Sequence, residues 1–156
     1  MKVSPDIITP IDFGAPPANQ IILPQGIIGF SSYQTGELLY MPDHLPFLWL
    51  RLHGPADAVH FIVMEPGNII ADYEPELFDE DALQLGIADP SEVMILNIVT
   101  LRQQTPVEAT VNLVGPIIVN RKTRIGRQLV ISNYSRYSAH YALVDHSPAQ
   151  VCARIA

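Results

Sequence analysis

Histidines are the first side chains to consider for catalysis or metal binding in this sequence. The chain has five: His44, His53, His60, His140 and His146. Their spacing forms neither HExxH nor another close metal-ligand pattern. His53 and His60 flank a turn and could approach each other across a hairpin, but two ordinary strand-end histidines explain this spacing better. The histidines therefore predict no metal site.

Other motifs of catalysis and cofactor binding are also absent. The sequence contains no GxSxG nucleophile elbow, no phosphate-binding loop and no dinucleotide glycine fingerprint. Cys152 is the only cysteine, so neither an internal disulfide nor a cysteine-based metal site can form. We therefore expect no cofactor and no enzymatic activity, although catalytic groups that converge from distant positions would leave no local motif.

Charged side chains are unevenly distributed. Carboxylates gather in a segment without lysine or arginine: Asp72, Glu74, Glu76, Asp79, Glu80, Asp81, Asp89 and Glu92. Consecutive acids such as Asp79–Asp81 could form a catalytic pair, but solvation and compensation of a helix dipole explain them better. Five of the nine bases lie in and just after one predicted hairpin: Arg121, Lys122, Arg124, Arg127 and Arg136. Opposite charges can steer two partners, or one partner with both signs; alternatively, the bases balance the acids within the molecule.

The elements that position these residues are mostly β-strands. Runs rich in β-branched and aromatic residues, bounded by turn signals, predict strands at 21–23, 38–40, 47–52, 59–64, 94–101, 110–114, 117–120, 128–132 and 141–144, with one more at 7–13. The 14 prolines disfavour a mainly helical chain. The sequence therefore predicts a mostly β fold, a small antiparallel β-barrel or sandwich with one short helix.

That helix is predicted at residues 80–85, inside the acidic segment. Asp79 is a suitable N-cap, Phe78 before it can pack against Leu83 as a hydrophobic staple, and Gly86 marks the end. Asp89-Pro90 repeats the cap-then-proline signal and predicts one further turn.

Two asparagines lie on predicted strands. Asn112 is mid-strand, where a buried amide must be hydrogen-bonded. Asn112 either ties down the chain break at Gly115-Pro116 or contacts the backbone of a partner. Asn120 is predicted to form the turn of a hairpin between strands 117–120 and 128–132.

Length and composition predict a single cytoplasmic domain. The 156 residues, 48% of them apolar, suit one core at 21–144, with an N-terminal arm at 1–20 and a C-terminal tail at 145–156. No run approaches the roughly 20 apolar residues of a membrane helix, and no secretion signal is recognisable. A net charge of −7 argues against nucleic-acid binding and permits attraction to a basic protein.

Three stretches resemble motifs of one protein family, in order between residues 21 and 141. They are QGIIGF at 25–30, the acidic segment that ends in LGIADP at 85–90, and VNLVGPIIVN at 111–120 followed by TRIGRQ at 123–128. Together they are similar to the signature of the FliW family of flagellar assembly factors.

This resemblance implies a compact β-barrel that binds flagellin, the filament protein, in the cytoplasm. It also implies antagonism of CsrA, an RNA-binding regulator that represses flagellin synthesis, so that flagellin occupying the factor would release CsrA. Because an RNA-binding protein must present basic surface, we expect CsrA to contact the acids Asp72, Glu74, Glu76, Asp79, Glu80 and Asp81. For flagellin we expect apolar contact and strand pairing at a sheet edge, with contacts at Phe30, Tyr73, Asn112 and Ile117.

Two other classes of function remain open. A small-ligand β-barrel sensor or enzyme would show a deep pocket holding histidines or carboxylates with displaced pKa values. A structural subunit would show a large apolar patch for self-association.

Overall fold

The structure, a computed structural model, describes residues 1–3, 19–67, 69–102 and 108–143. The strand expected at 7–13, most of the predicted arm and the predicted tail lie outside these residues. Within the described ranges no helix is long and apolar enough to cross a membrane.

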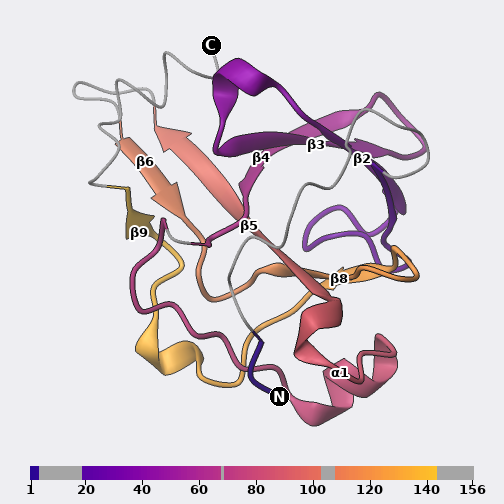
Figure 1. The fold of residues 1–156 in the computed structure, drawn as a ribbon. Helices are drawn as coiled ribbons and strands as arrows, with labels where there is room; N and C mark the ends of the chain where they lie inside the picture. Colours follow the sequence, from indigo (N-terminus) through magenta and orange to yellow (C-terminus); the bar gives the residue numbers. More distant parts are fainter. Residues whose placement is uncertain (4–18, 68, 103–107, 144–156) are drawn as a thin grey trace.

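Antiparallel β-structure dominates the described chain, as predicted (Figure 1). The strands are β1 Gln20–Ile22, β2 Thr35–Leu39, β3 Phe47–His53, β4 Val59–Met64, β5 Val93–Arg102, β6 Glu108–Val111, β7 Ile117–Asn120, β8 Gly126–Gln128 and β9 Tyr141–Ala142. The short helix α1 spans Asp79–Gln84, and single helical turns occur at η1 Pro42–His44, η2 Pro90–Glu92 and η3 Tyr134–Arg136.

Strand β5 joins the two parts of the sheet. Its second half pairs with β4 and β6, with Val99 opposite both Ile62 and Val111. Its first half pairs instead with β7, with Leu96 opposite Ile117. Side chains on both faces of this first half are buried, which is why the sequence there is a continuous apolar run rather than an alternating one.

The sheet curls into a barrel-like shape around one of two cores. The order β1-β2-β3-β4-β5 continues through β7 into β8, and a single parallel bridge between Ile22 and Ile125 brings the ends of this path together. The inward side chains form the first core: Ile21, Leu23, Ile27, Leu38, Leu48, Leu50, Leu52, Val63, Met94, Leu96, Ile117 and Val119. The second core lies between the other face of β5, strands β6 and β9, and α1 with the segment that leads into it.

In two of the predicted strands, side chains and turns redirect the backbone and change the bounds. The strand expected at 110–114 ends at Val111, since Asn112 Oδ1 accepts hydrogen bonds from the N–H groups of Val114 and Gly115, at 3.0 and 2.9 Å. The return strand expected at 128–132 is instead Gly126–Gln128. The prediction that Asn112 ties down the Gly115-Pro116 break is confirmed.

The start of α1 also differs from the prediction. Asp79 is the first helical residue, and the N-cap position belongs to Phe78, which makes no side-chain cap. Phe78 and Leu83 remain 50% and 79% exposed, so the predicted hydrophobic staple is wrong. The next turn forms as predicted: Asp89 Oδ1 accepts the N–H of Ser91 at 2.9 Å, in front of η2.

Candidate functional site

The carboxylates expected to contact CsrA lie on one stretch of chain that leads into α1. We call Asp72, Glu74, Glu76, Asp79, Glu80 and Asp81 the acidic surface. Of these, Asp72, Glu74, Asp79 and Glu80 are exposed, whereas Glu76 and Asp81 are half-buried. The structure therefore keeps these acids at the surface, where a protein partner can reach them.

Hydrogen bonds to the loop around η3 hold the backbone beneath the acidic surface. The Tyr137 hydroxyl accepts the N–H of Glu74 at 2.8 Å and donates to the carbonyl of Asp72 at 3.3 Å. Asn133 accepts the N–H of Glu76 at 2.9 Å and donates to the carbonyl of Glu74 at 2.8 Å. These bonds fix the spacing of carboxylates that a free loop would leave variable.

Cations of the same chain offset the acidic surface in part. Four of its six acids lie within 4.0 Å of a cation: the pairs are Lys2–Glu74 at 4.0 Å, Lys2–Glu76 at 3.8 Å, the N-terminal ammonium with Asp79 at 3.3 Å, and Arg127–Asp81 at 3.5 Å. Neither Asp72 nor Glu80 forms an ion pair with any described residue. Because the Lys2 side chain is 67% exposed, its ion pairs are worth little, about 0–1 kcal/mol. The surface keeps an excess of carboxylate.

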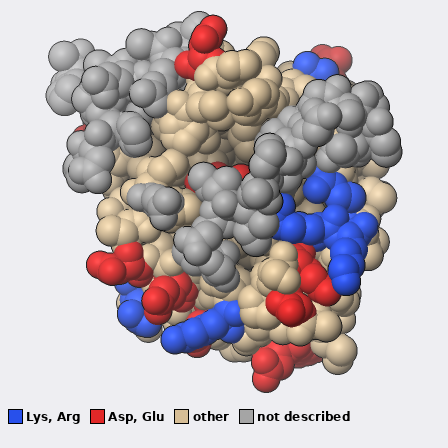
Figure 2. Space-filling view, in the orientation of Figure 1, with Lys and Arg blue, Asp and Glu red and all other residues tan. Residues whose placement is uncertain are grey.

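The basic side chains gather over the turn between β7 and β8, with acidic side chains beside them (Figure 2). Three of them form ion pairs with carboxylates: Lys122–Glu92 at 2.9 Å, Arg121–Glu65 at 3.5 Å and Arg127–Asp81 at 3.5 Å. Among these pairs, just Arg127 contacts a member of the acidic surface. Internal balance therefore explains part of the charge pattern, largely through acids outside that surface.

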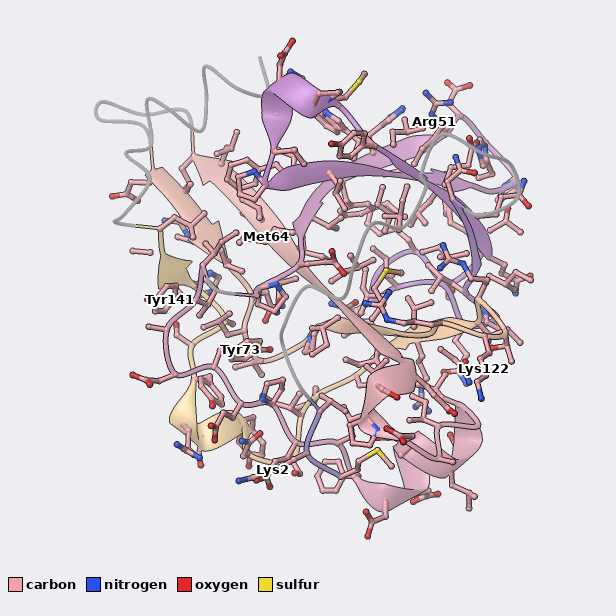
Figure 3. All side chains as sticks on the ribbon, viewed as in Figure 1. Lys2, Arg51, Met64, Tyr73, Lys122 and Tyr141 are labelled. Atoms are coloured by element: carbon pink, nitrogen blue, oxygen red, sulfur yellow. The ribbon has the colours of Figure 1, made fainter. Side chains whose placement is uncertain are left out.

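Two of these ion pairs, Arg121–Glu65 and Lys122–Glu92, differ in burial. Around Glu65 and Arg121 desolvation outweighs the mutual attraction, so burial raises the pKa of Glu65 and lowers the pKa of Arg121. At the exposed end of the hairpin (Figure 3), the hydrogen bond from Lys122 holds the pKa of Glu92 below its usual range. The Arg121–Glu65 pair is thus structural, whereas Lys122, with a side chain 74% exposed, remains accessible.

Asn120 connects the basic hairpin to α1. Its Oδ1 accepts the N–H groups of Lys122 and Thr123, at 2.9 and 3.3 Å, which confirms the predicted turn. Its Nδ2 donates to the carbonyls of Leu85 and Gly86, at 2.9 and 3.4 Å, and thereby satisfies the C-terminal end of α1. No local sequence pattern indicates this second role, because the helix end lies 35 residues away.

A buried polar network lies in the second core, around Tyr73. The Tyr73 hydroxyl donates to the carbonyl of Leu113 at 2.7 Å and accepts from Asn97 Nδ2 at 3.2 Å. Asn97 also donates to the carbonyl of Asn112 at 3.0 Å. Burial raises the pKa of Tyr73 strongly, so this side chain remains a neutral hydrogen-bonding group. Sequence reasoning missed Asn97, which lies within the apolar run Val93–Val99 of β5.

The four residues expected to contact flagellin do not form one surface. Tyr73 and Ile117 are 2% and 0% exposed and belong to the two cores, so their selection as surface contacts is wrong in this structure. Asn112 is half-buried and engaged in its turn. Phe30 is half-buried and packs edge-on against Tyr33 and Phe61, which leaves Phe30 as the one partly accessible aromatic of the set.

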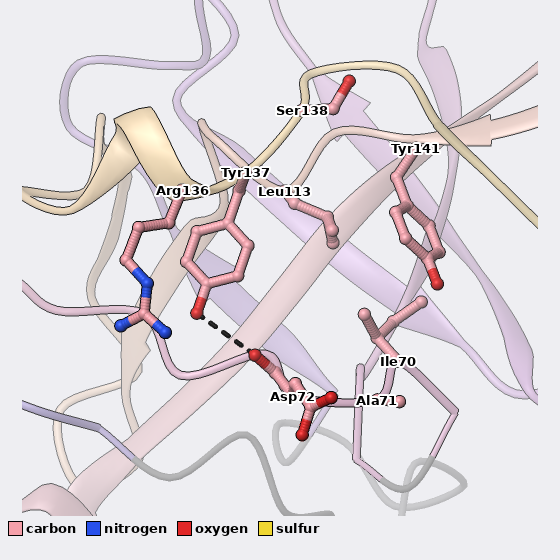
Figure 4. A pocket seen from close by; sticks show the side chains of 8 residues that line it. All are labelled: Ile70, Ala71, Asp72, Leu113, Arg136, Tyr137, Ser138 and Tyr141. Atoms are coloured by element: carbon pink, nitrogen blue, oxygen red, sulfur yellow. Dashed lines mark hydrogen bonds between the residues drawn. The ribbon is translucent and has the colours of Figure 1, made fainter.

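A pocket of about 420 Å³ lies beside β9, at the edge of the sheet (Figure 4). Its lining is Ile70, Ala71, Asp72, Leu113, Arg136, Tyr137, Ser138 and Tyr141. Apart from one carboxylate, one guanidinium and Ser138, this lining is apolar and aromatic, and it contains no histidine. Across the described ranges no three histidine, cysteine or acidic side chains are placed to hold a metal ion. The lining of this pocket therefore lacks the histidines expected of a sensor or enzyme site and holds a single carboxylate, Asp72.

Comparison with known proteins gives a consistent result over most of the chain. The model of the FliW protein family matches residues 11–143. The flagellar assembly factor FliW of Natranaerobius thermophilus is 34% identical over 141 residues, which cover 88% of this chain and 92% of the relative. That of Clostridioides difficile is 34% identical over 125 residues, which cover 80% and 94%. A crystal structure of the flagellar assembly factor FliW superimposes with a TM-score of 0.70 and 28% identity, over 83% of this chain and 88% of the other. The residues that the family model matches include the first core, the second core apart from Val3, and the acidic surface.

Proposed function

The chain belongs to the FliW family, and we propose that it acts as a flagellar assembly factor by binding two proteins, flagellin and CsrA, without catalysing a reaction. In this proposal the protein works in the cytoplasm and sequesters CsrA, the repressor of flagellin synthesis. Flagellin that has not yet been exported occupies the factor and releases CsrA. Synthesis of the filament protein is thereby coupled to its export.

The observation that carries the CsrA half of this proposal is the exposed acidic surface. An RNA-binding regulator presents basic side chains to neutralise phosphates, and a complementary acidic partner attracts the same side chains. Asp72 and Glu80 form no ion pair with a described residue, and the exposed pairs of Glu74 and Asp79 can exchange their cation for one of CsrA at little cost.

A charge-reversal experiment with a matched control tests this proposal. The triple variant Glu74→Lys, Asp79→Lys, Glu80→Lys reverses three exposed carboxylates of the acidic surface. The control variant reverses three exposed carboxylates elsewhere: Asp43→Lys, Asp57→Lys and Glu108→Lys. Both variants raise the net charge equally, so a difference between them reports the position of the charge.

Association with CsrA is measured by stopped-flow at low and at physiological salt. Because charge steers the encounter of two proteins, the first triple variant slows association by about ten-fold or more at low salt, and the difference shrinks as salt screens it. The control variant slows association far less. Equal rate constants for the two variants at low salt would reject the acidic surface as the CsrA contact.

Flagellin requires a contact of a different kind. An extended segment of flagellin pairs with an exposed sheet edge and buries apolar side chains against the factor. Amide hydrogen exchange in the presence of a peptide from a flagellin terminus tests this: protection is expected at a strand edge and at neighbouring apolar residues. Protection confined to the acidic surface would contradict the proposal that flagellin and CsrA contact different parts of the protein.

A further inference from the structure

The pocket beside β9 is formed by the loop around η3 and the start of the acidic surface (Figure 4). We call it the β9 pocket. Leu113 is buried in its lining, and the half-buried rings of Tyr137 and Tyr141 lie on the two sides of Leu113. Its volume of about 420 Å³ falls in the range of sites that take a small ligand or part of a peptide. The hydroxyl of Tyr137 is bonded to the backbone of Asp72 and Glu74, so this recess is already in place before a ligand arrives.

Two opposite charges line the β9 pocket without forming an ion pair. The carboxylate of Asp72 and the guanidinium of Arg136 are both exposed, and neither forms an ion pair with any residue that the structure describes. The guanidinium lies 5.8 Å from the centre of the Tyr137 ring. A ligand that covers the pocket removes water from both groups, and a charge that loses its water without gaining a partner is costly. The occupant must therefore offer a group of opposite sign to each of them.

The outer edge of β9 lies beside the same pocket. The N–H of Leu143 donates to the carbonyl of Ala109 at 3.1 Å, and Tyr141 is opposite Val111. Because successive residues of an antiparallel strand direct their backbone groups to opposite edges, the N–H and C=O of Ala142 point away from β6. Strand β9 is the last in the order of the sheet, and these two groups bond to no other described residue. An extended segment can pair with such an edge.

We propose that the β9 pocket and the outer edge of β9 together dock an extended segment of flagellin. The backbone of the segment pairs with Ala142, a large apolar side chain enters the pocket, and an acidic and a basic side chain beside it meet Arg136 and Asp72. The proposal rests on the proposed function, because it assigns one of the two partners to a place on the molecule. The place combines strand pairing with apolar burial, as expected for flagellin, whereas the basic side chains of CsrA would face the like charge of Arg136.

Asp72 is the residue at which the β9 pocket meets the acidic surface. A flagellin segment that pairs with Asp72 takes one exposed carboxylate away from CsrA. The segment also covers Tyr137, the residue that holds the backbone of Glu74, so it lies next to the following carboxylate of the acidic surface. The contacts of the two partners are different but share this border, and flagellin in the pocket therefore hinders CsrA.

The test fills the pocket and blocks the edge in separate variants, each with a matched control. Ala71 is exposed and lines the pocket, so Ala71→Phe fills it without a change of charge. Ala56→Phe is its control, at an exposed alanine in the turn between β3 and β4. Ala142→Pro removes the outward N–H of β9 because proline has no amide hydrogen, and Ala142→Ser keeps it. A fifth variant, Arg136→Gln, removes one exposed charge. Affinities for purified flagellin and for purified CsrA are measured for these variants and for the wild type.

We expect Ala71→Phe and Ala142→Pro to weaken flagellin binding by more than about ten-fold, because each removes a contact at the centre of the docked segment. Arg136→Gln weakens flagellin binding by a smaller factor and does not weaken CsrA binding, since it removes a charge of the same sign as CsrA. The controls Ala56→Phe and Ala142→Ser stay within about two-fold of wild type. Retained affinity for CsrA shows that the variants are folded.

Each other outcome overturns a distinct statement. If the wild type binds flagellin and the pocket, edge and charge variants bind it equally well, the docking site is wrong and the proposed function stands. If the wild type does not bind flagellin, the proposed function fails. If these variants lose CsrA alone, the pocket serves the other partner. If light scattering shows that Ala71→Phe dissociates an oligomer of the factor, a second copy of this chain occupies the pocket. If Ala71→Phe or Ala142→Pro does not fold, the comparison of Arg136→Gln with the wild type decides.

Discussion

Replacement of Asn120 by alanine is expected to loosen both α1 and the basic hairpin, because the side chain of Asn120 holds both. The Nδ2 group satisfies the carbonyl of Leu85 at 2.9 Å, inside the protein, and a buried carbonyl left without a donor costs about 1–3 kcal/mol. The two bonds to the turn at Lys122 and Thr123 are partly accessible, so water replaces them in part and their loss adds about 0.5–1.5 kcal/mol. Together Asn120→Ala should destabilise the protein by about 2–4 kcal/mol.

A second variant separates the two roles. Asn120→Asp keeps the oxygen that accepts from the turn but replaces the donor to Leu85 with a second oxygen. At neutral pH this carboxylate faces a carbonyl, so we expect Asn120→Asp to be at least as unstable as Asn120→Ala. Burial raises the pKa of the introduced carboxyl. As the pH falls through that raised pKa, the carboxyl becomes protonated and can donate to the Leu85 carbonyl again. The free energy of unfolding of Asn120→Asp should then approach that of Asn120→Ala.

Urea unfolding followed by circular dichroism, between neutral and mildly acidic pH, measures both variants. The urea concentration at the midpoint of unfolding should fall for both variants. The slope of the unfolding free energy against urea concentration should stay the same, because it depends on the surface exposed on unfolding. If Asn120→Ala lowers the free energy of unfolding by less than about 1 kcal/mol, the Asn120 side chain does not hold α1 and the hairpin as described. The same conclusion follows if the difference between the aspartate and alanine variants does not depend on pH.

Three further outcomes are expected from single sites. Tyr73→Phe removes a buried hydroxyl that bonds to a carbonyl and to an amide, so urea unfolding should show a loss of about 1–3 kcal/mol. Gly126→Ala places a Cβ 2.8 Å from Val119 Cγ2 inside the hairpin, and the same measurement should show about 1–3 kcal/mol of overpacking. The backbone N–H hydrogen bond from Ser91 holds the pKa of Asp89 below the ordinary 3.8. The stability that ionised Asp89 contributes to the fold is therefore fully present above pH 3.8 and is lost as the pH falls through the lower pKa of the folded state. Carboxyl NMR titration should place Asp89 below an unstructured aspartate.

Strands with sharp local boundaries could be predicted from the sequence. The runs at 59–64 and 117–120 are bounded by proline, glycine or asparagine, and their observed limits are the predicted ones. The run at 128–132 also looks like a strand, since Leu129 and Ile131 are buried. There, however, the N–H groups bond to the carbonyls of Pro116 and Val114 as an irregular segment, because the turn at Asn112 has already displaced the partner strand.

The candidate surfaces were predictable to different degrees. Exposure of the acids followed from local composition, since a run of carboxylates cannot be buried without partners. The bonds from Tyr137 and Asn133 that fix their spacing join residues about 60 positions apart, and no local pattern indicates such contacts. The exposure of Ile22 on β1 could not be predicted for another reason, because a β-branched residue fits a strand equally well inside or outside the core.

Titration of the purified protein with purified CsrA, alone and after saturation with flagellin, examines the proposed mode of action in a single assay. Saturable binding of CsrA that weakens as flagellin is added is the expected result, since occupancy by flagellin must release the regulator. If neither protein binds the purified chain, a role in flagellar assembly through these two partners is contradicted.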